Sequence, residues 1–132
     1  MIEGDVDAAL AAYGPKFTYH NPVLKRMPGV DGVIAIRFLT EGAQAAFPDF
    51  RYAIEAVIGE RKLVAVLSSR KGAHLNSLGG VPATGRTVSA TGAIVCRVAR
   101  GRIVEQWDID DRLEVMEQLG LLPRPMVAGA SS

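Results

Sequence analysis

Three aspartates stand close together near the end of the chain, beside its single tryptophan: Asp108, Asp110 and Asp111 follow Trp107. The preceding residues, from Ile103 onward, are typical of a β-strand, in which successive side chains point to opposite faces. Asp108 then lies on one face of the strand and Trp107 on the other. A carboxylate that a strand carries towards a cavity is a candidate for proton transfer.

Asp108 is the aspartate whose position suits acid–base chemistry. It lies within the strand, too far from the following helix to cap it. In a mostly apolar pocket, loss of hydration disfavours the charged form, so a carboxyl group there could take up and release a proton near neutral pH. The alternative is a carboxylate at a rim, paired with an arginine such as Arg97 or Arg70.

The other two aspartates have simpler structural explanations. Asp111 precedes a helical run and has Glu114 three residues later, which is the spacing of a capping box. Its side chain is therefore expected to accept hydrogen bonds from amides of the first helical turn. Asp110 is expected to be a solvated charge at the strand end.

The chain has two histidines, His20 and His74. Without closely spaced carboxylates they give a weak metal signal, so neither zinc nor iron is expected. His20 ends a short strand beside Asn21 and could enter the mouth of a cavity, whereas His74 follows a later strand. The glycine-rich loop at 77–85 lacks the sequence of a phosphate-binding loop, and Cys96 lies within a strand, so nucleophilic catalysis is not supported.

The elements that must position these residues follow from the hydrophobic pattern. Helices are expected at about 4–13, 30–47 and 112–119, and strands at about 16–21, 50–58, 63–74, 86–98 and 103–111. Helices first, then long strands joined by turns, predict an α+β fold with an antiparallel sheet. A strongly curved sheet packed against the N-terminal helices would form a cone-shaped barrel that encloses an apolar pocket.

Length and composition indicate one ordinary domain. The chain has 132 residues, 48% of them hydrophobic and 22% charged. Residues 1–122 are expected to form the domain and residues 123–132 a disordered tail. The net charge of +1, with interleaved acids and bases, indicates no nucleic-acid partner. A single cysteine, no signal-peptide pattern and no apolar run near the roughly 20 residues of a membrane span predict a cytoplasmic protein without a membrane partner.

Several short motifs resemble those of a known family. They are Phe47-Pro48-Asp49-Phe50, Gly72-Ala73-His74, Gly80-Val81-Pro82-Ala83-Thr84-Gly85-Arg86, Gly101-Arg102-Ile103-Val104-Glu105-Gln106-Trp107-Asp108 and Leu119-Gly120-Leu121-Leu122. In this order and spacing, the chain resembles the SnoaL-like polyketide cyclase family, within the superfamily of nuclear transport factor two-like cones. The resemblance covers about residues 4–122.

The resemblance implies a deep, mainly apolar pocket, usually in a homo-oligomer, either dimer or tetramer. Characterised members close a ring of an aromatic polyketide by intramolecular aldol condensation, without metal or organic cofactor. One aspartate serves as acid and base, at the position of Asp108, and the histidine of the family's early His-x-Pro segment corresponds to His20. The positions expected to contact the substrate are Asn21, His74, Ile94, Gln106 and Trp107.

Two features of the chain differ from the family pattern. The cyclases carry polar side chains, including a histidine, on the strand before the last, and hairpin counting places those positions near Gly92 and Ile94. The family also usually begins with a further helix, and this domain lacks it. Either a neighbouring subunit covers the opening, or the start codon is misassigned, or the pocket is unusually open.

Three functions follow from these patterns. The first is a cofactor-independent cyclase or isomerase that acts on a hydrophobic, polyketide-like substrate through Asp108. The second is a non-catalytic module that binds a small apolar ligand or serves in dimerisation. The third is hydration or hydrolysis by a water that Asp108 activates, which needs a tighter polar network than the sequence indicates.

Overall fold

The computed structural model describes residues 6–26 and 32–123 of the chain. They form the helices α1 (Val6–Leu10), α2 (Gly32–Ala46) and α3 (Arg112–Gln118), and the short 3-10 helix η1 (Pro22–Arg26). The strands are β1 (Tyr13–His20), β2 (Arg51–Glu60), β3 (Leu63–Ala73), β4 (Thr87–Ala99) and β5 (Arg102–Asp110). The tail expected at 123–132 lies, from residue 124 onward, outside the described residues.

These strands form one sheet in the order β1-β5-β4-β3-β2. From β2 to β5, neighbours in sequence are antiparallel neighbours in space, as predicted. β1 pairs with β5 in parallel, so the sheet is mixed rather than wholly antiparallel. Parallel strands need a crossover connection, and here most of the chain lies between the two strands. Local sequence pattern could not reveal this pairing.

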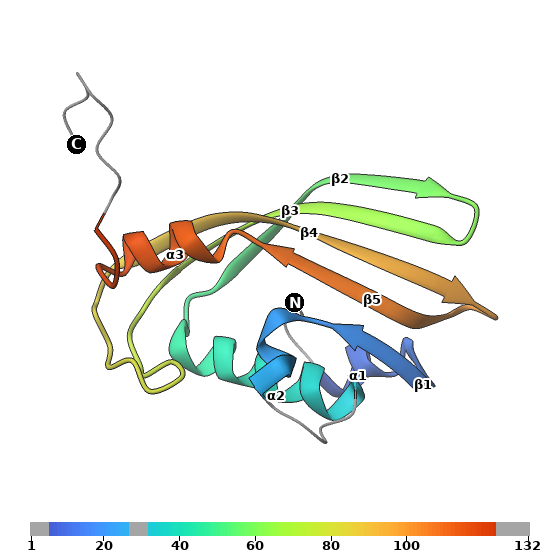
Figure 1. Cartoon of the computed structure of the whole chain (residues 1–132), viewed down its shortest axis with the longest axis horizontal. Coiled ribbons are helices and arrows are strands. Elements are labelled where there is room, and N and C mark those ends of the chain that lie inside the picture. The colour runs from blue at the N-terminus through green and yellow to red at the C-terminus, as the bar shows by residue number, and fades with distance from the viewer. Residues whose placement is uncertain (1–5, 27–31, 124–132) are drawn as a thin grey trace.

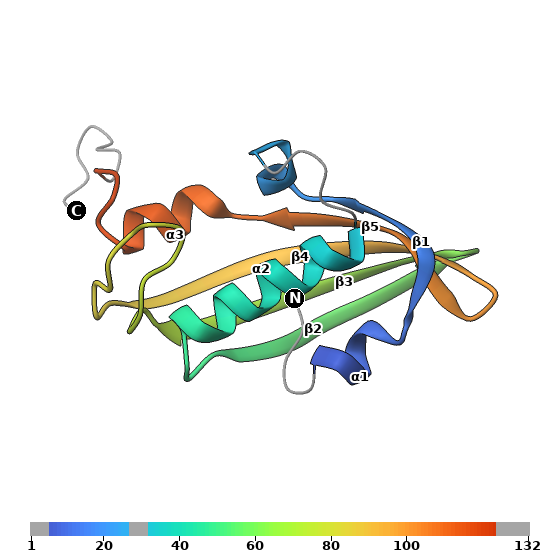
Figure 2. The ribbon, with the colours of Figure 1, turned by 90° about the horizontal axis from the view of Figure 1, so that it is seen from below.

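The sheet curves over α2, which lies on its concave side (Figure 1, Figure 2). The predicted α+β fold with a strongly curved sheet is thereby confirmed. Within residues 6–26 and 32–123 the sheet ends at two edges, β1 and β2, so it curls without closing into a barrel. No helix in this part of the chain is long and apolar enough to cross a membrane.

Helix α2 packs closely against β1. Ala35 and Ile36 of the helix are buried in one hydrophobic cluster with Phe17 and Tyr19 of the strand. At the helix start, a Cβ on Gly32 would lie 2.5 Å from the carbonyl oxygen of Phe17, so only glycine allows this approach. The packing fixes the position of the edge strand β1, and with it that of Tyr19, next to α2.

The first helix is shorter than predicted. It ends at Leu10, and β1 already begins at Tyr13, so that Gly14 and Pro15 lie inside the strand rather than ending the helix. β1 is an edge strand, where a proline that lacks an amide hydrogen need not break a hydrogen-bond ladder.

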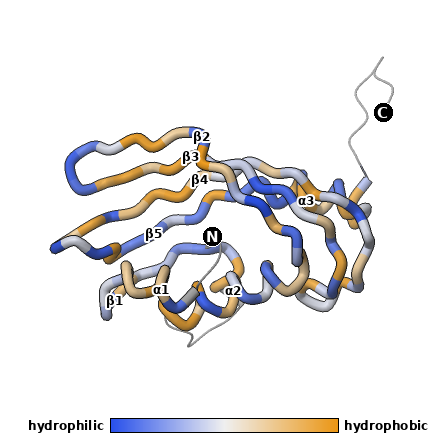
Figure 3. Tube along the Cα trace, turned by 180° about the vertical axis from the view of Figure 1, so that it is seen from behind, coloured by the Kyte–Doolittle hydropathy of each residue, from blue (hydrophilic) through white to orange (hydrophobic). Residues whose placement is uncertain are grey.

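A band across the face of the sheet turned away from α2 is apolar. Pairing of the strands aligns two rows of side chains across it, and we call this surface the outer apolar face. Its largest exposed members include Ile58 (67% exposed), Leu67 (46%) and Ile109 (59%). Figure 3 shows hydrophobic residues along β2, β3 and β4. The two rows are Ile58, Ala65, Val95 and Trp107, and Ala56, Leu67, Ala93 and Ile109.

Candidate functional site

Strand β5 carries Asp108 on the same face as Gln106, which is buried with 1% exposure. On the edge strand, Tyr19 pairs with Gln106 and His20 pairs with Trp107. β1 ends at His20, so Asp108 lies one residue beyond the last position of β5 that pairs with β1. The carboxylate is therefore held where the edge of β5 becomes uncovered.

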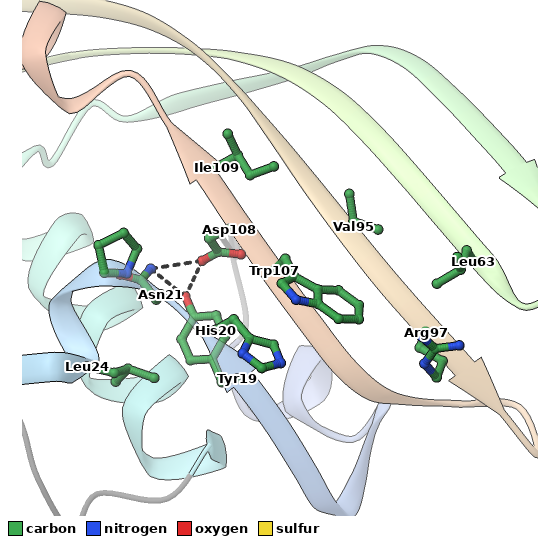
Figure 4. A pocket seen from close by; sticks show the side chains of 11 residues that line it. Tyr19, His20, Asn21, Leu24, Leu63, Val95, Arg97, Trp107, Asp108 and Ile109 are labelled. Carbon is green, nitrogen blue, oxygen red and sulfur yellow. Dashed lines mark hydrogen bonds between the residues drawn. The ribbon is translucent and has the colours of Figure 1, made fainter.

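Three side chains donate hydrogen bonds to the Asp108 carboxylate. Figure 4 shows two of them, Tyr19 and Asn21. The Tyr19 hydroxyl donates to Oδ2, and Asn21 Nδ2 donates to the same oxygen at 3.1 Å. Gln106 Nε2 donates to Oδ1 at 2.7 Å. Both carboxylate oxygens thus have a fixed direction relative to the sheet.

None of the described arginines or lysines pairs with Asp108. Arg97 Nε lies 3.2 Å from Glu105 Oε1, and Arg70 Nη2 lies 2.8 Å from Asp110 Oδ1. The alternative of a rim carboxylate held by either arginine is therefore wrong. Asp108 is instead oriented by neutral donors.

A second layer of hydrogen bonds fixes these donors. The Tyr13 hydroxyl donates to Gln106 Oε1 at 2.8 Å, which turns the amide nitrogen of Gln106 towards Asp108. Burial raises the pKa of both Tyr13 and Tyr19 above the ordinary value for tyrosine, and the charge of Asp108 raises both further. Both hydroxyls therefore keep their protons. Burial also raises the pKa of the neighbouring Cys96 thiol.

An open depression of about 870 Å³ adjoins Asp108. Its volume falls in the range of roughly 300–1,000 Å³ that is usual for ligand pockets. Because β1 ends beside it, the depression is bordered by Tyr19 and Asn21 from one face of the sheet and by Trp107 from the other. Most of the remaining lining is apolar, with Pro22, Leu24, Leu63, Val95 and Ile109.

His20 also lines this depression, but its contacts are with other residues than Asp108. Its Nε2 lies 2.7 Å from Glu105 Oε2, and its ring stacks on Trp107 with 5.0 Å between the centroids. The hydrogen bond from His20, followed by that from Arg97, lowers the pKa of the Glu105 carboxyl. The two residues that the sequence predicts as catalytic thus line the same depression, but His20 bonds to Glu105 rather than to Asp108.

Of the positions expected to contact substrate, three lie at or near the carboxylate. Asn21 and Gln106 donate to it, and Gln106 is too buried to touch a ligand directly. Ile94, one of the two positions to which hairpin counting assigned the family's polar side chains, is the direct cross-strand neighbour of Asp108, and it offers no polar group. Trp107 lines the depression from the other face of β5.

His74 lies apart from these residues. Its side chain is completely buried at the end of β3, and its ring lies 5.5 Å from that of Phe47. The amide of Thr84 donates to His74 Nδ1 at 3.2 Å, and the Thr84 hydroxyl lies 3.0 Å from the same nitrogen. His74 is not among the residues that line the depression. Its hydrogen bonds with Thr84 stabilise the loop between β3 and β4.

Sequence reasoning missed Tyr13 and Tyr19. Their roles depend on the parallel pairing of β1 with β5, which joins residues about ninety positions apart. Strand alternation could have indicated Tyr19, because it places the Tyr19 side chain on the same face as Asn21 and on the opposite face from His20.

The predictions for Asp111 and Asp110 have different outcomes. Asp111 is the N-cap of α3, and its Oδ1 accepts a hydrogen bond from the Glu114 amide at 3.0 Å, which confirms the predicted cap. The prediction that Asp110 is merely a solvated charge is wrong. Its side chain is 21% exposed and lies between Arg70 and Arg112. In the described ranges, no group of three His, Cys, Asp or Glu side chains is arranged to hold a metal ion.

Several solved structures are similar to this chain. AclR from Streptomyces galilaeus, a candidate hydroxylase, has a TM-score of 0.80 and 23% identity over 94% of this chain and 76% of its own. IdmH from Streptomyces antibioticus, a candidate polyketide cyclase, has a TM-score of 0.72 and 28% identity over 88% of this chain and 87% of its own. A candidate SnoaL-like polyketide cyclase from Jannaschia sp. CCS1 has a TM-score of 0.74 and 26% identity over 89% and 80%.

Among curated proteins, none is similar enough to the chain to count as a match. The family model of the SnoaL-like polyketide cyclases matches residues 2–119. This match covers most of the chain, including every strand and the residues around Asp108. The chain belongs to the SnoaL-like polyketide cyclase family.

Proposed function

We propose that the chain is a cofactor-independent enzyme that closes a ring in a hydrophobic, polyketide-like substrate by intramolecular aldol condensation. Asp108 acts first as general base and then as general acid. The observation that carries this proposal is the Asp108 carboxylate, which borders a large, mainly apolar depression and is oriented by three side-chain donors.

The chemistry needs one proton to move to Asp108 and back. The carboxylate takes a proton from a carbon next to a carbonyl group, and the electrons of that C–H bond form an enolate. The enolate carbon attacks a second carbonyl of the same molecule, so a C–C bond forms and the attacked oxygen becomes an alkoxide. The alkoxide then takes the proton from Asp108. Folding of the substrate in the depression supplies much of the acceleration, because it holds the two carbons together.

The donors around Asp108 serve both halves of this cycle. Tyr19 and Asn21 orient the carboxylate while it is charged. Once Asp108 has taken up the proton, both donors have lost a charged acceptor and can hydrogen-bond the enolate oxygen instead. Tyr19 suits this role because burial keeps its hydroxyl protonated.

The experiment that tests the proposal is ring closure of linear aryl polyketones by wild type and by Asp108→Asn. The amide keeps the shape of the side chain and removes the base, so kcat should fall by about 10³-fold. Asp7→Asn is the matched control, since it makes the same change on α1 at a side chain that is 81% exposed. Equal ring closure by wild type and Asp108→Asn would exclude the mechanism.

A second candidate is a binding module that holds an apolar ligand without changing it. The observation that favours it is Ile94, which stands directly opposite Asp108 where the cyclases carry polar side chains. This function predicts that every polyketone is recovered unchanged from wild type, and that Asp108→Asn alters only the affinity.

Hydration or hydrolysis is distinguished in the same assay. The polar network of Tyr19, Asn21 and Gln106 around Asp108 is tighter than the sequence indicated. Running the reaction in ¹⁸O-labelled water separates the two chemistries. Label in the product without a new C–C bond would assign an activated water in place of the aldol step.

We also propose that two copies of the chain pack through the outer apolar face. Contiguous exposed apolar surface across several strands is typical of an interaction site, and a two-fold contact uses the same patch on both copies. The depression lies partly on this face, since Val95 and Ile109 belong to both. A second copy would therefore cover its open side and exclude water from Asp108.

A further inference from the structure

Two arginines and one aspartate form a cluster next to the Asp108 network. Arg70 Nη2 lies 2.8 Å from Asp110 Oδ1, and Arg112 Nη2 lies 3.5 Å from Asp110 Oδ2. We call these three residues the arginine cluster. They come from β3, β5 and the first residue of α3, and the Arg70–Asp110 pair passes over Gly92 of β4.

Gly92 leaves room for this arrangement. A Cβ at Gly92 would lie 3.0 Å from Asp110 Oδ1 and 3.2 Å from Arg70 Nη2. A side chain at this position would therefore force the two charged groups to shift by a few tenths of an ångström. The strand before the last therefore offers space at this position, and the charged groups of its two neighbours fill that space from either side.

The three side chains of the arginine cluster carry two positive charges and one negative charge, and two of their buried donors have no acceptor among the described residues. A guanidinium is always protonated, so two positive charges share the single carboxylate of Asp110. The Nε atoms of Arg70 and Arg112 are both buried, and neither has a hydrogen-bond partner among the described residues. A buried donor without an acceptor is costly, and a bound anion would supply the acceptor.

The arginine cluster is connected to the proposed base through Asn21. Asn21 Oδ1 accepts a hydrogen bond from Arg112 Nη2 at 2.9 Å, while its Nδ2 donates to Asp108. Asp108 and Asp110 share a face of β5 and are two residues apart, which corresponds to about 7 Å along a strand. The Arg112 side chain is 42% exposed, so part of the cluster is accessible to a ligand, and Asn21, which joins Arg112 to Asp108, also lines the depression.

We propose that the arginine cluster binds a carboxylate group of the substrate while Asp108 acts on a carbon a few bonds away. The proposal rests on the proposed function and narrows its substrate class to hydrophobic keto acids that keep a free carboxylate. Arg112 supplies the exposed part of the site with the planar fork that matches a carboxylate, and Arg70 supplies the buried charge behind it.

The test uses 2-naphthoate and its neutral analogue 2-naphthamide as probes. Trp107 is the single tryptophan of the chain and lines the depression, so its fluorescence reports binding, with calorimetry as a second readout. Wild type should bind 2-naphthoate at least tenfold more tightly than 2-naphthamide. In Arg112→Gln this preference should disappear, whereas Arg37→Gln, which removes a cation of similar exposure (41%) on α2 that does not line the depression, should keep it.

Three outcomes would overturn the proposal: equal binding of the two probes by wild type, an unchanged preference in Arg112→Gln, or an equal loss in Arg37→Gln. In those cases the cluster is only a structural ion pair. If Arg112→Gln fails to fold by circular dichroism, Arg112→Lys replaces it, and the loss of the planar fork should still reduce the preference several-fold.

Asp108→Asn separates this proposal from the proposed function. The variant should lose ring closure and still bind 2-naphthoate at least as tightly as wild type, because one negative charge near the probe is removed. Retained ring closure in Asp108→Asn, together with a lost preference in Arg112→Gln, would reject the mechanism and keep the anion site.

Discussion

At the scale of single residues, the three neighbouring aspartates differ in their partners. Asp111 caps a helix, Asp110 pairs with arginines, and Asp108 is held by neutral donors. Tyr19→Phe removes one of those donors, and a hydrogen bond to a charged group contributes about 1.5–3 kcal/mol. We expect kcat to fall at least about tenfold with little change in KM. Tyr52→Phe, on β2, is the control and should leave both constants unchanged.

The buried tyrosines also predict how stability depends on pH. The pKa of Tyr13 and of Tyr19 is raised in the folded chain, whereas in the unfolded chain both ionise near pH 10. The unfolded state therefore loses protons first, and the free energy of unfolding should fall as pH rises above about 10. Urea denaturation between pH 8 and 11 measures this. The Tyr13→Phe/Tyr19→Phe variant should lose less stability over that range, and an equal loss in both proteins would contradict the account.

At the scale of elements, the sequence pattern predicted the antiparallel strands that are neighbours along the chain. Hairpin counting assigned the family's polar positions to Gly92 and Ile94, and the hairpin between β4 and β5 places Gly92 opposite Asp110 and Ile94 opposite Asp108. The parallel pairing of β1 with β5 depends on contacts between distant segments, so the bond from Tyr19 to Asp108 could not be predicted. The same limit hid the partner of His20, because Glu105 becomes its neighbour only through that pairing.

The helix cap gives a prediction at this scale. Asp111→Ala removes the side-chain acceptor of the Glu114 amide, and loss of an N-cap typically costs about 1 kcal/mol. The helix matters because Val115 and Leu119 pack in the cluster with Phe47. Chemical denaturation should show this loss for Asp111→Ala, while Asp111→Ser, which can still cap, should lose only a small part. Equal losses in the two variants would argue against the cap.

At the scale of the whole molecule, the concave side of the sheet and the outer apolar face differ in polarity. The concave side carries the polar network, and the outer apolar face is proposed to bind a second copy. Leu67→Glu introduces a charge at the centre of that face and should convert a dimer into a monomer in sedimentation experiments, with a parallel loss of ring closure. Leu75→Glu changes a residue that is 52% exposed outside the strands and should remain dimeric. A monomeric wild type would contradict the proposed assembly.

The most direct test of Asp108 as the catalytic base measures hydrogen exchange at the α-carbon of a ketone. A bicyclic aryl ketone whose α-hydrogens exchange slowly in neutral water is incubated in D₂O with the protein, and deuterium at the α-carbon is followed by mass spectrometry. If Asp108 is the base, wild type and Asp7→Asn should accelerate the exchange to the same extent, and Asp108→Asn should reduce it to the uncatalysed rate. Exchange by Asp108→Asn at the wild-type rate would contradict the account.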